Sequence, residues 1–372
     1  MAAPPDDDAP CCGPKPGPPS SPHERPGYTL LHFIDDFVDS TAGPVPRVNT
    51  SLQVKDIMGT TRARLGVSRD RYRVAPGLYC VGSPSPDSPV LVTANYKLSF
   101  DSLRKELDDV DAWILVLDTR GVNVWCAAGK RTFSTEEVVL QVKRVGLEKL
   151  VNHRELILPQ LGAPGVSSHL VKKGCGFKVI WGPIRANDLK VFLNNGQQAA
   201  PEMRQLTFTI GERMVLIPVE LSLIIKPTLF ILLGAFVLSG ISPDIFSFSA
   251  AWSRGLTISG AYLLGMLAGA VVVPSLLPWL PTRQFYIKGI MAGLISGILS
   301  ILLFADTISN LEALTLLLLS MSVSSFAAMN FTGATPFTSP SGVEKEMRHG
   351  IPVQALAVLI GIVAWATAPF IA

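Results

Sequence analysis

The sequence contains few cysteines, and their spacing is not that of a metal site. The five are Cys11, Cys12, Cys80, Cys126 and Cys175, an odd number without a C-x-x-C motif. This pattern argues against a disulfide framework and against a four-cysteine metal or iron–sulfur site. We therefore expect reduced thiols in a cytosolic domain. Cys11 and Cys12 are either a modification site or two thiols in a mobile tail.

Signals for secretion, nucleotides and nucleic acids are also missing. Residues 1–27 are rich in proline and lack the basic start and apolar centre of a signal peptide, so we expect a disordered tail. No G-x-G-x-x-G motif follows a predicted strand, and Arg131 after Lys130 excludes a Walker A loop. The net charge is only +3, without a basic cluster that interleaves aromatic residues, which argues against nucleic-acid binding.

Apolar residues are abundant, and the long apolar runs lie in the second half of the chain. The mean hydropathy is +0.37, which is high for an ordinary soluble protein. Five runs reach the roughly 20 residues that cross a bilayer: residues 221–241, 256–277, 285–305, 311–331 and 352–371. We expect a soluble part, a linker over 206–220 and an all-α transmembrane domain of five helices over 221–372.

The charges that flank these runs predict an orientation. The basic residues expected in loops on the side of the soluble part are Arg283, Lys288, Lys345, Arg348 and His349. Arg254 is expected in an outer loop, and Lys226 near a helix end, where its ammonium group can reach the interface. The excess of positive charge predicts a multi-pass protein of the inner, cytoplasmic membrane, with its soluble part in the cytoplasm and its C-terminus outside.

Glycines recur every four residues within two of the runs. They are Gly265 and Gly269 in the second run, and Gly289, Gly293 and Gly297 in the third. This spacing indicates either close contact between helices or the general enrichment of glycine in membrane helices.

The soluble part alternates strands and helices. Four apolar strands are predicted at 90–95, 112–118, 155–160 and 177–182, and helices at 97–110, 134–146, 165–174 and 185–196. The helix at 134–146 opens with a capping box formed by Ser134 and Glu137. This order predicts an α/β, Rossmann-like domain with a parallel sheet over residues 90–205.

Loops at the carboxyl ends of parallel strands form the ligand crevice of such folds. Three loops should meet there, namely 119–133, 159–166 and 181–187, and all are rich in glycine, proline or other small residues. Small side chains let the backbone approach a broad, flat ligand.

The first of these loops carries a recognisable motif. The stretch "NVWCAAGK", residues 123–130, resembles the signature of the corrinoid protein of the microbial mercury-methylating pair, a relative of the large subunit of corrinoid iron–sulfur proteins. The resemblance extends through "PQLGAPG" and "WGPI" and the order of soluble domain and membrane helices, over roughly residues 50–372. It implies that residues 90–205 bind a corrinoid with its nucleotide base off cobalt.

The resemblance also implies site residues. In that family the motif forms a helix under the corrin ring, with its cysteine beside cobalt, so Cys126 becomes the metal ligand and catalytic residue. The implied cofactor-binding residues are Asn123, Val124, Trp125, Cys126, Ala127, Ala128, Gly129, Lys130, Gly162, Ala163, Pro164, Gly165, Gly182 and Pro183. Trp125 could instead simply pack this helix, Asn123 cap it, and Lys130 be solvated.

Two departures from better-known corrinoid proteins narrow the chemistry. None of the five histidines lies in a D-x-H-x-x-G motif, which argues against histidine ligation. The chain lacks the four-cysteine cluster of the ordinary corrinoid iron–sulfur subunit, so electrons must come from another protein, which the resemblance identifies as a small ferredoxin-like protein with two [4Fe–4S] clusters.

A thiolate at position 126 suits an electrophilic methyl acceptor. A thiolate is a strong, soft donor to cobalt, and a helix start lowers the pKa of a thiol. Donation from below favours departure of the methyl group with its bonding electrons, which Hg(II) requires. The alternative for Cys126 is a small buried hydrophobic residue.

The remaining soluble segments are less informative. Cys80 is expected to be structural, and Cys175 either an ordinary loop or core cysteine or a mercury-handling thiol. Residues 28–89 form a lead-in segment, whose arginines from Arg62 to Arg73 are either a solvated face or a surface for an acidic ferredoxin or the corrinoid tail.

The sequence thus predicts a membrane-anchored corrinoid methyltransferase that takes a methyl group from a folate-type donor and passes it to Hg(II). The alternatives are a corrinoid methyl carrier of one-carbon metabolism and a non-catalytic membrane receptor or transporter of cobalamin.

Overall fold

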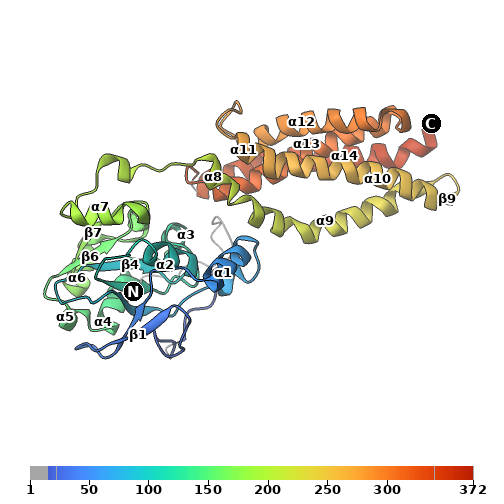
Figure 1. Cartoon of the computed structure of the whole chain (residues 1–372). Coiled ribbons are helices and arrows are strands. Elements are labelled where there is room, and N and C mark those ends of the chain that lie inside the picture. Colours follow the sequence, from blue (N-terminus) through green and yellow to red (C-terminus); the bar gives the residue numbers. More distant parts are fainter. Residues whose placement is uncertain (1–15, 22, 339, 372) are drawn as a thin grey trace. The chain divides into compact units, whose positions relative to one another are not determined.

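The computed structural model describes residues 16–21, 23–338 and 340–371, which form two units (Figure 1). The first unit contains the described residues up to 63 and residues 67–207, and the second contains 64–66 and the described residues from 208 on. Cys11 and Cys12 lie outside the described residues, as does most of the predicted tail. In the described part of that tail, the N–H of Ser20 donates to the carboxylate of Asp118 at 2.6 Å.

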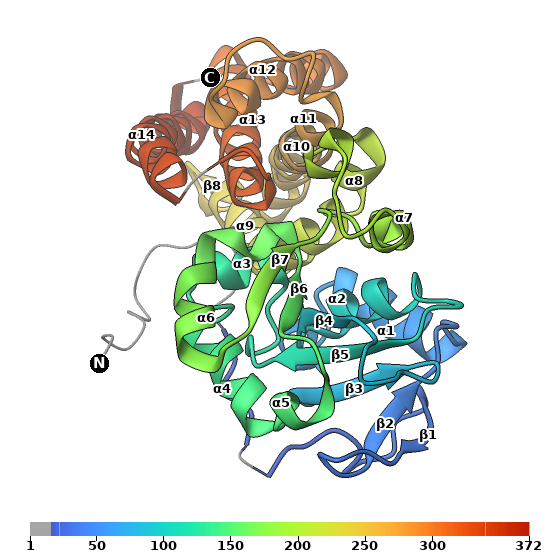
Figure 2. The ribbon, with the colours of Figure 1, turned by 90° about the vertical axis from the view of Figure 1, so that its left-hand side faces the viewer.

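A seven-stranded sheet forms the centre of the first unit (Figure 2). Its strands in chain order are β1 (Ile34–Val38), β2 (Val45–Val48), β3 (Gly77–Val81), β4 (Val90–Ala94), β5 (Ala112–Leu117), β6 (Glu155–Leu158) and β7 (Lys178–Trp181). Their order across the sheet is β1-β2-β3-β5-β4-β6-β7. The four strands predicted from the sequence, β4 to β7, are parallel to one another, as expected.

The sheet is mixed rather than wholly parallel, because the lead-in segment 28–89 adds three strands. β3 pairs antiparallel with β5, β2 runs parallel to β3, and β1 closes the edge as an antiparallel partner of β2. Every residue of β3 is buried, so its apolar side chains require this central position. The lead-in segment is therefore an integral part of the sheet.

Helices cover both faces of the sheet. One core lies between the sheet and α3 (Val124–Gly129), α4 (Thr135–Arg144), α5 (Leu147–Leu150) and α6 (Ser168–Cys175). The other lies between the opposite face and α2 (Lys97–Arg104) and α7 (Leu189–Asn194). Neighbouring residues of β4 alternate between the cores, because Val90 and Val92 belong to the first and Leu91 to the second.

A buried ionic cluster joins α1 (Val54–Arg64) to α2. Lys97 Nζ lies 2.7 Å from Asp56 and 2.6 Å from Asp101, and Arg104 bonds to the same two carboxylates at 2.8 Å and 2.7 Å. Burial alone raises the pKa of Asp56, but hydrogen bonds from Lys97, the N–H of Gln53 and the imidazole of His32 outweigh it and hold the pKa below its ordinary value. Two cations balance two anions, so neither sign is left uncompensated in the interior.

The second unit is a helical bundle (Figure 1). The long helices are α9 (Ile217–Ser239), α10 (Phe248–Leu267), α12 (Phe285–Leu303), α13 (Asn310–Phe331) and α14 (Pro340–Ile371). The short elements are α8 (Ile210–Met214), β8 (Ile241–Ser242), β9 (Ile245–Phe246), the π-helix η5 (Ala268–Val272), α11 (Val273–Leu276), and the 3₁₀ helices η6 (Ala305–Thr307) and η7 (Thr332–Ala334). Five helices are long and apolar enough to cross a membrane, which confirms the predicted number for the described part of the chain.

Several charged residues of this unit lie elsewhere than expected. Lys288 is inside α12, and Lys345, Arg348 and His349 are inside α14, rather than in loops. Arg254 is inside α10 rather than in a loop, where it pairs with Glu312 of α13 at 2.6 Å and donates to the carbonyl oxygen of Trp365 in α14. Lys226 lies well inside α9, because that helix starts at Ile217, before the apolar run begins. Apolar length alone therefore misplaced these residues, since helices continue through charged residues that find partners or exposed positions.

Both sets of regularly spaced glycines mark close contacts between helices, which was one of the two explanations given for their spacing. A Cβ added to Gly289 would lie 2.5 Å from Cα of Ser325, and one on Gly269 would lie 2.2 Å from the carbonyl oxygen of Ser324. Both neighbours belong to α13. The glycines of α10 with η5 and those of α12 therefore let two helices pack on the serine-rich backbone of α13.

Candidate functional site

The four parallel strands define a switch point at one edge of the sheet. After β4 the chain moves to β5 on one side, and then crosses β4 to reach β6 on the other side. Ligands of open α/β sheets bind at the carboxyl ends of strands where this reversal occurs. The three loops singled out in the sequence leave the carboxyl ends of β5, β6 and β7.

The motif helix α3 follows β5 after a tight turn. Arg120 and Gly121 both have positive φ, and the side chain of Asn123 caps the helix by accepting the N–H of Cys126 at 2.9 Å. Cys126 is half-buried, while Ala127 and Ala128 are buried in the first core. The motif therefore presents a half-buried cysteine on a helix whose two alanines pack into the first core.

A buried asparagine holds the turn before α3, and the sequence analysis did not identify it. Asn95 directly follows β4 and is fully buried. Its Oδ1 accepts the N–H groups of Thr119 and Gly121 at 3.1 Å and 2.9 Å, and its Nδ2 donates to Asp118 at 3.0 Å. The signal that could have revealed it is a polar residue at the end of a fully apolar strand. Asn95 thereby fixes the entry of the motif loop from the neighbouring strand.

Glu137 supports the same turn from the other side, which corrects the predicted capping box. Ser134 does cap α4 by accepting the N–H of Glu137 at 3.3 Å. The Glu137 carboxylate, however, accepts the N–H of Asp118 at 2.8 Å and a hydrogen bond from Gln141. Burial raises the pKa of this carboxyl above its ordinary value, against the opposing effect of the Asp118 N–H. The Glu137 carboxylate therefore hydrogen-bonds to the loop that precedes the motif helix, rather than to the N-terminus of α4.

The loop after β6 packs directly against the motif helix. It forms the 3₁₀ helix η2 (Gln160–Gly165), in which Pro164 is exposed and Ala163 is half-buried. A Cβ on Gly165 would lie 2.9 Å from Cα of Ala128, and one on Gly162 would lie 2.5 Å from the ring of Phe133. These two glycines are therefore required by protein packing, and they bring η2 against α3 and the turn that follows it.

Gly129 differs from these glycines, because the protein leaves open space around it. A Cβ there would meet no atom within 4 Å, and Gly129 is exposed at the end of α3. Nothing in the protein's own packing requires a glycine at this position. The residues on either side, Ala128 and Lys130, are buried and half-buried.

The start of the third loop is hydrogen-bonded to the end of β6. The N–H of Gly182 donates to the carbonyl oxygen of Leu158 at 2.8 Å, and both Gly182 and Pro183 are buried. Residues 182 and 183 therefore lie in the interior beside the end of β6 rather than on an exposed surface. Trp125 and Val124 are half-buried, and Val124 packs at the margin of the first core.

The two other described cysteines have ordinary structural surroundings. Cys80 is fully buried in β3, and burial raises the pKa of its thiol to about 12. Cys175 ends α6, donates to the carbonyl oxygen of Val171 at 3.3 Å, and has a thiol pKa that burial raises. Among the described residues no three His, Cys, Asp or Glu side chains gather as a metal site. His153 precedes β6 and so lies at the opposite edge of the sheet.

Comparisons with known proteins match the segment that contains these loops. Residues 51–193 match the family described as CO dehydrogenase/acetyl-CoA synthase delta subunit. The gamma subunit of the acetyl-CoA decarbonylase/synthase complex from Methanopyrus kandleri is 34% identical over 127 residues, which are 34% of this chain and 27% of the relative. The corresponding subunit from Archaeoglobus fulgidus is 30% identical over 142 residues, or 37% of this chain and 30% of the relative.

A corrinoid/iron–sulfur protein large subunit from Moorella thermoacetica is 30% identical over 122 residues, which are 32% of this chain and 27% of that subunit. The chain thus spans less than a third of the length of these relatives. The similarity relates the sheet unit to corrinoid iron–sulfur and acetyl-CoA synthase subunits, and the family match ends before the five apolar helices.

Proposed function

We propose that this chain is a membrane-anchored corrinoid protein that transfers a methyl group to Hg(II) and yields methylmercury. The observation that carries the proposal is the packing of the Cys126 helix against the glycine-rich η2 loop, within the segment similar to a corrinoid/iron–sulfur protein subunit. The corrinoid-binding domain is Rossmann-like in this proposal, and the ligand lies over the carboxyl ends of β4 to β7.

The residues at this edge fit a broad, flat ring. α3 and η2 expose or half-expose small residues there, namely Gly129, Ala163 and Pro164, beside the half-buried Trp125, Gln160 and Leu161. The open space at Gly129 explains a glycine that the protein's packing does not need, because a Cβ there would approach the ring. The buried pair Gly182 and Pro183 would support the ring's edge through the end of β6.

Cys126 would provide the soft donor. When bound, a corrinoid supplies a cobalt centre that can carry a methyl group and release it. Cys126 would hold that cobalt through its sulfur, a strong and soft donor, and this donation would favour transfer of the methyl group to electrophilic Hg(II). Asn123 would hold the backbone of Cys126 in the first turn of α3 through their 2.9 Å hydrogen bond.

The proposal requires partners. The chain has five cysteines and no C-x-x-C motif, so it contains no four-cysteine cluster of its own to supply electrons. We infer a small ferredoxin-like protein with two [4Fe–4S] clusters as reductant and a folate-type methyl donor. The five apolar helices would anchor the chain in the cytoplasmic membrane with the sheet unit in the cytoplasm. A reporter fused to the C-terminus tests this orientation, since it should be active only on the outer side.

A second function is favoured by the printed names of the relatives. Subunits of an acetyl-CoA decarbonylase/synthase complex suggest a methyl carrier of one-carbon metabolism whose acceptor is not mercury. A membrane receptor or transporter of cobalamin would share the binding site and perform no chemistry.

One experiment separates these functions. The full chain, purified in detergent, is titrated with cobalamin and followed by absorption spectroscopy, and we expect the spectrum of cobalamin with its nucleotide base off cobalt. The loaded protein is then given a reductant, a methyl donor and either Hg(II) or a thiol acceptor. Methylmercury formation supports the proposal, methylation of the thiol alone supports the carrier, and binding without turnover supports the receptor. An unchanged spectrum of free cobalamin would contradict all three.

A further inference from the structure

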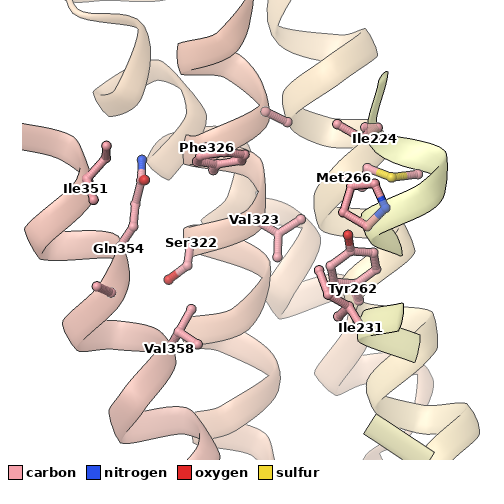
Figure 3. A pocket seen from close by; sticks show the side chains of 13 residues that line it. Ile224, Ile231, Tyr262, Met266, Ser322, Val323, Phe326, Ile351, Gln354 and Val358 are labelled. Atoms are coloured by element: carbon pink, nitrogen blue, oxygen red, sulfur yellow. The ribbon is translucent and has the colours of Figure 1, made fainter. Parts of the chain in front are cut away.

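The membrane unit contains a cavity that the proposed chemistry does not use (Figure 3). Its volume is about 360 Å³, within the range of small-molecule pockets. Four helices line it, with Pro227 on α9, Tyr262 on α10, Phe326 on α13 and Gln354 on α14 among the contributing residues. All of these helices are apolar enough to lie in a bilayer, so the cavity faces hydrocarbon rather than water.

The walls are almost entirely apolar, and their polar groups are largely paired. The hydroxyls of Tyr262 and Thr228 lie 3.0 Å apart, and Ser322 donates to the carbonyl oxygen of Leu318 within α13. Such walls favour a hydrocarbon body, because they offer dispersion contacts and little competition from water.

Gln354 is the exception. It is 93% buried, since only 7% of its surface is accessible, and its Nε2 donates to Ser325 at 2.8 Å. Within the described part of the chain, no group donates a hydrogen bond to its Oε1. A carbonyl oxygen without a donor is costly in an apolar environment, so this atom is suited to accept a hydrogen bond from a ligand in the cavity.

The cavity also has a lateral opening. Ala355 and Ile351 of α14 line the cavity and are nevertheless exposed, as is Ile231 of α9 across from them. Only 6% of the apolar part of α9 is buried in the unit, so this helix forms a loosely attached wall. A molecule dissolved in the bilayer could therefore enter between α9 and α14.

From this geometry we propose that the membrane unit binds a single-chain amphiphile whose hydrocarbon chain fills the cavity and whose hydroxyl or protonated carboxyl group donates to Gln354 Oε1. The apolar walls favour the hydrocarbon chain of the ligand. The amide oxygen of Gln354 favours a ligand with a hydrogen-bond donor over a plain alkane. The inference is independent of the corrinoid chemistry proposed for the sheet unit, because it concerns a different unit of the chain.

Photolabelling tests the proposal on the full chain in phosphatidylcholine nanodiscs. The probe is a long-chain fatty alcohol with a diazirine in its chain, and labelled peptides are mapped by mass spectrometry. We expect labels to concentrate on the lining residues of α13 and α14. An unlabelled fatty alcohol should compete better than the alkane of equal length, by roughly threefold to tenfold, the value of one hydrogen bond.

Three variants make the result decisive. Ala355→Phe fills the opening and should lower labelling of the lining residues by about tenfold, as expected when a pocket is blocked. Val363→Phe adds the same ring at another exposed position of α14, which does not line the cavity, and should leave labelling unchanged. Gln354→Leu should abolish the preference for the alcohol over the alkane.

Three outcomes would overturn the proposal. They are equal labelling of all exposed helix faces, unchanged labelling in Ala355→Phe, and cross-links showing that a helix of a second copy fills the cavity.

Discussion

The side-chain oxygen of Asn123 accepts a hydrogen bond from the backbone N–H of Cys126, with 2.9 Å between the two heavy atoms. This contact satisfies one of the N–H groups that a helix start leaves unpaired, and it fixes the backbone at the motif cysteine. Because α3 has only six residues, one cap is a large share of its local stability.

Removing this cap should loosen α3. Asn123→Ala is expected to cost about 1 kcal/mol, which corresponds to roughly fivefold faster opening. Hydrogen exchange of the Cys126 amide, measured by mass spectrometry on the full chain in detergent, should accelerate by that factor. Asn123→Ser keeps a capping oxygen and should exchange at nearly the original rate. Equal exchange in all three proteins would show that the cap does not hold the motif.

Glu137 should give the sheet unit a defined pH dependence. Its folded-state pKa is raised from the ordinary value of 4.5, mainly by burial. Stability that is fully present below the unfolded pKa is therefore lost as the pH rises through the folded pKa. Glu137→Gln keeps an oxygen for the N–H of Asp118 but cannot ionise. We expect this variant to become more stable relative to the wild type as the pH rises above about 4.5.

The measurement is the difference in thermal midpoint between variant and wild type, followed by tryptophan fluorescence over a pH series. Taking the difference cancels other titrating groups, including Asp56, whose lowered pKa gives the opposite slope. Glu136→Gln is the matched control, because Glu136 neighbours Glu137 on α4 and is exposed. A difference that does not vary with pH would contradict the assigned role of Glu137.

The glycine contacts of the bundle can be tested with one pair of variants. Gly289→Ala would place a methyl group 2.5 Å from Cα of Ser325, and should destabilise the bundle by about 1–3 kcal/mol through overpacking. Gly234→Ala, on exposed α9, meets no atom within 4 Å and should be neutral or stabilising, since alanine favours helix by about 1 kcal/mol. The stability of each variant is measured as the midpoint temperature at which half of the protein is no longer monodisperse in detergent. Similar midpoints for the two variants would argue against tight packing on α13.

Apolar runs allowed β4 to β7 to be predicted within two residues of their observed bounds, because strands buried on both faces read as continuous apolar segments. β1 and β2 could not be found in this way. β1 contains two aspartates and occupies the edge of the sheet, where polar residues are tolerated. β2 has only four residues, one of them a proline, and lies next to that edge between β1 and β3. Their pairing depends on contacts between distant segments rather than on a local pattern.

The candidate site, like the sheet, could be predicted from the sequence only in part. The loops of the motif could be located from the sequence because parallel strands place their carboxyl ends at one edge of a sheet. The supports of the motif could not, since Asn95 bonds across 24 residues to Thr119 and Glu137 across 19 residues to Asp118. Glu137 even matched a local capping motif, but burial near the β5 turn gave its carboxylate a different partner.

Replacing Cys126 by histidine should separate cofactor binding from mercury chemistry. Histidine can bind cobalt but donates less electron density than a thiolate, which favours transfer of the methyl group as a cation. We expect the variant to bind cobalamin, with a spectrum altered by the nitrogen ligand, and to form little methylmercury. Efficient methylmercury formation by Cys126→His would show that a thiolate is not needed.

The Cys126→Ala variant is the most direct test of the proposed mechanism. The half-buried thiol neighbours two buried alanines, so alanine should fit the helix with little loss of stability. The circular dichroism spectrum should match that of the wild type, as should the hydrogen exchange rate of the residue 126 amide, which Asn123 caps. Cobalamin should still bind through contacts to α3 and η2. Methylmercury formation with reductant and methyl donor should fall to background, because the only soft donor of the motif is gone. Near-normal methylmercury formation by purified, folded Cys126→Ala protein would contradict thiolate ligation and leave this cysteine a packing residue of α3.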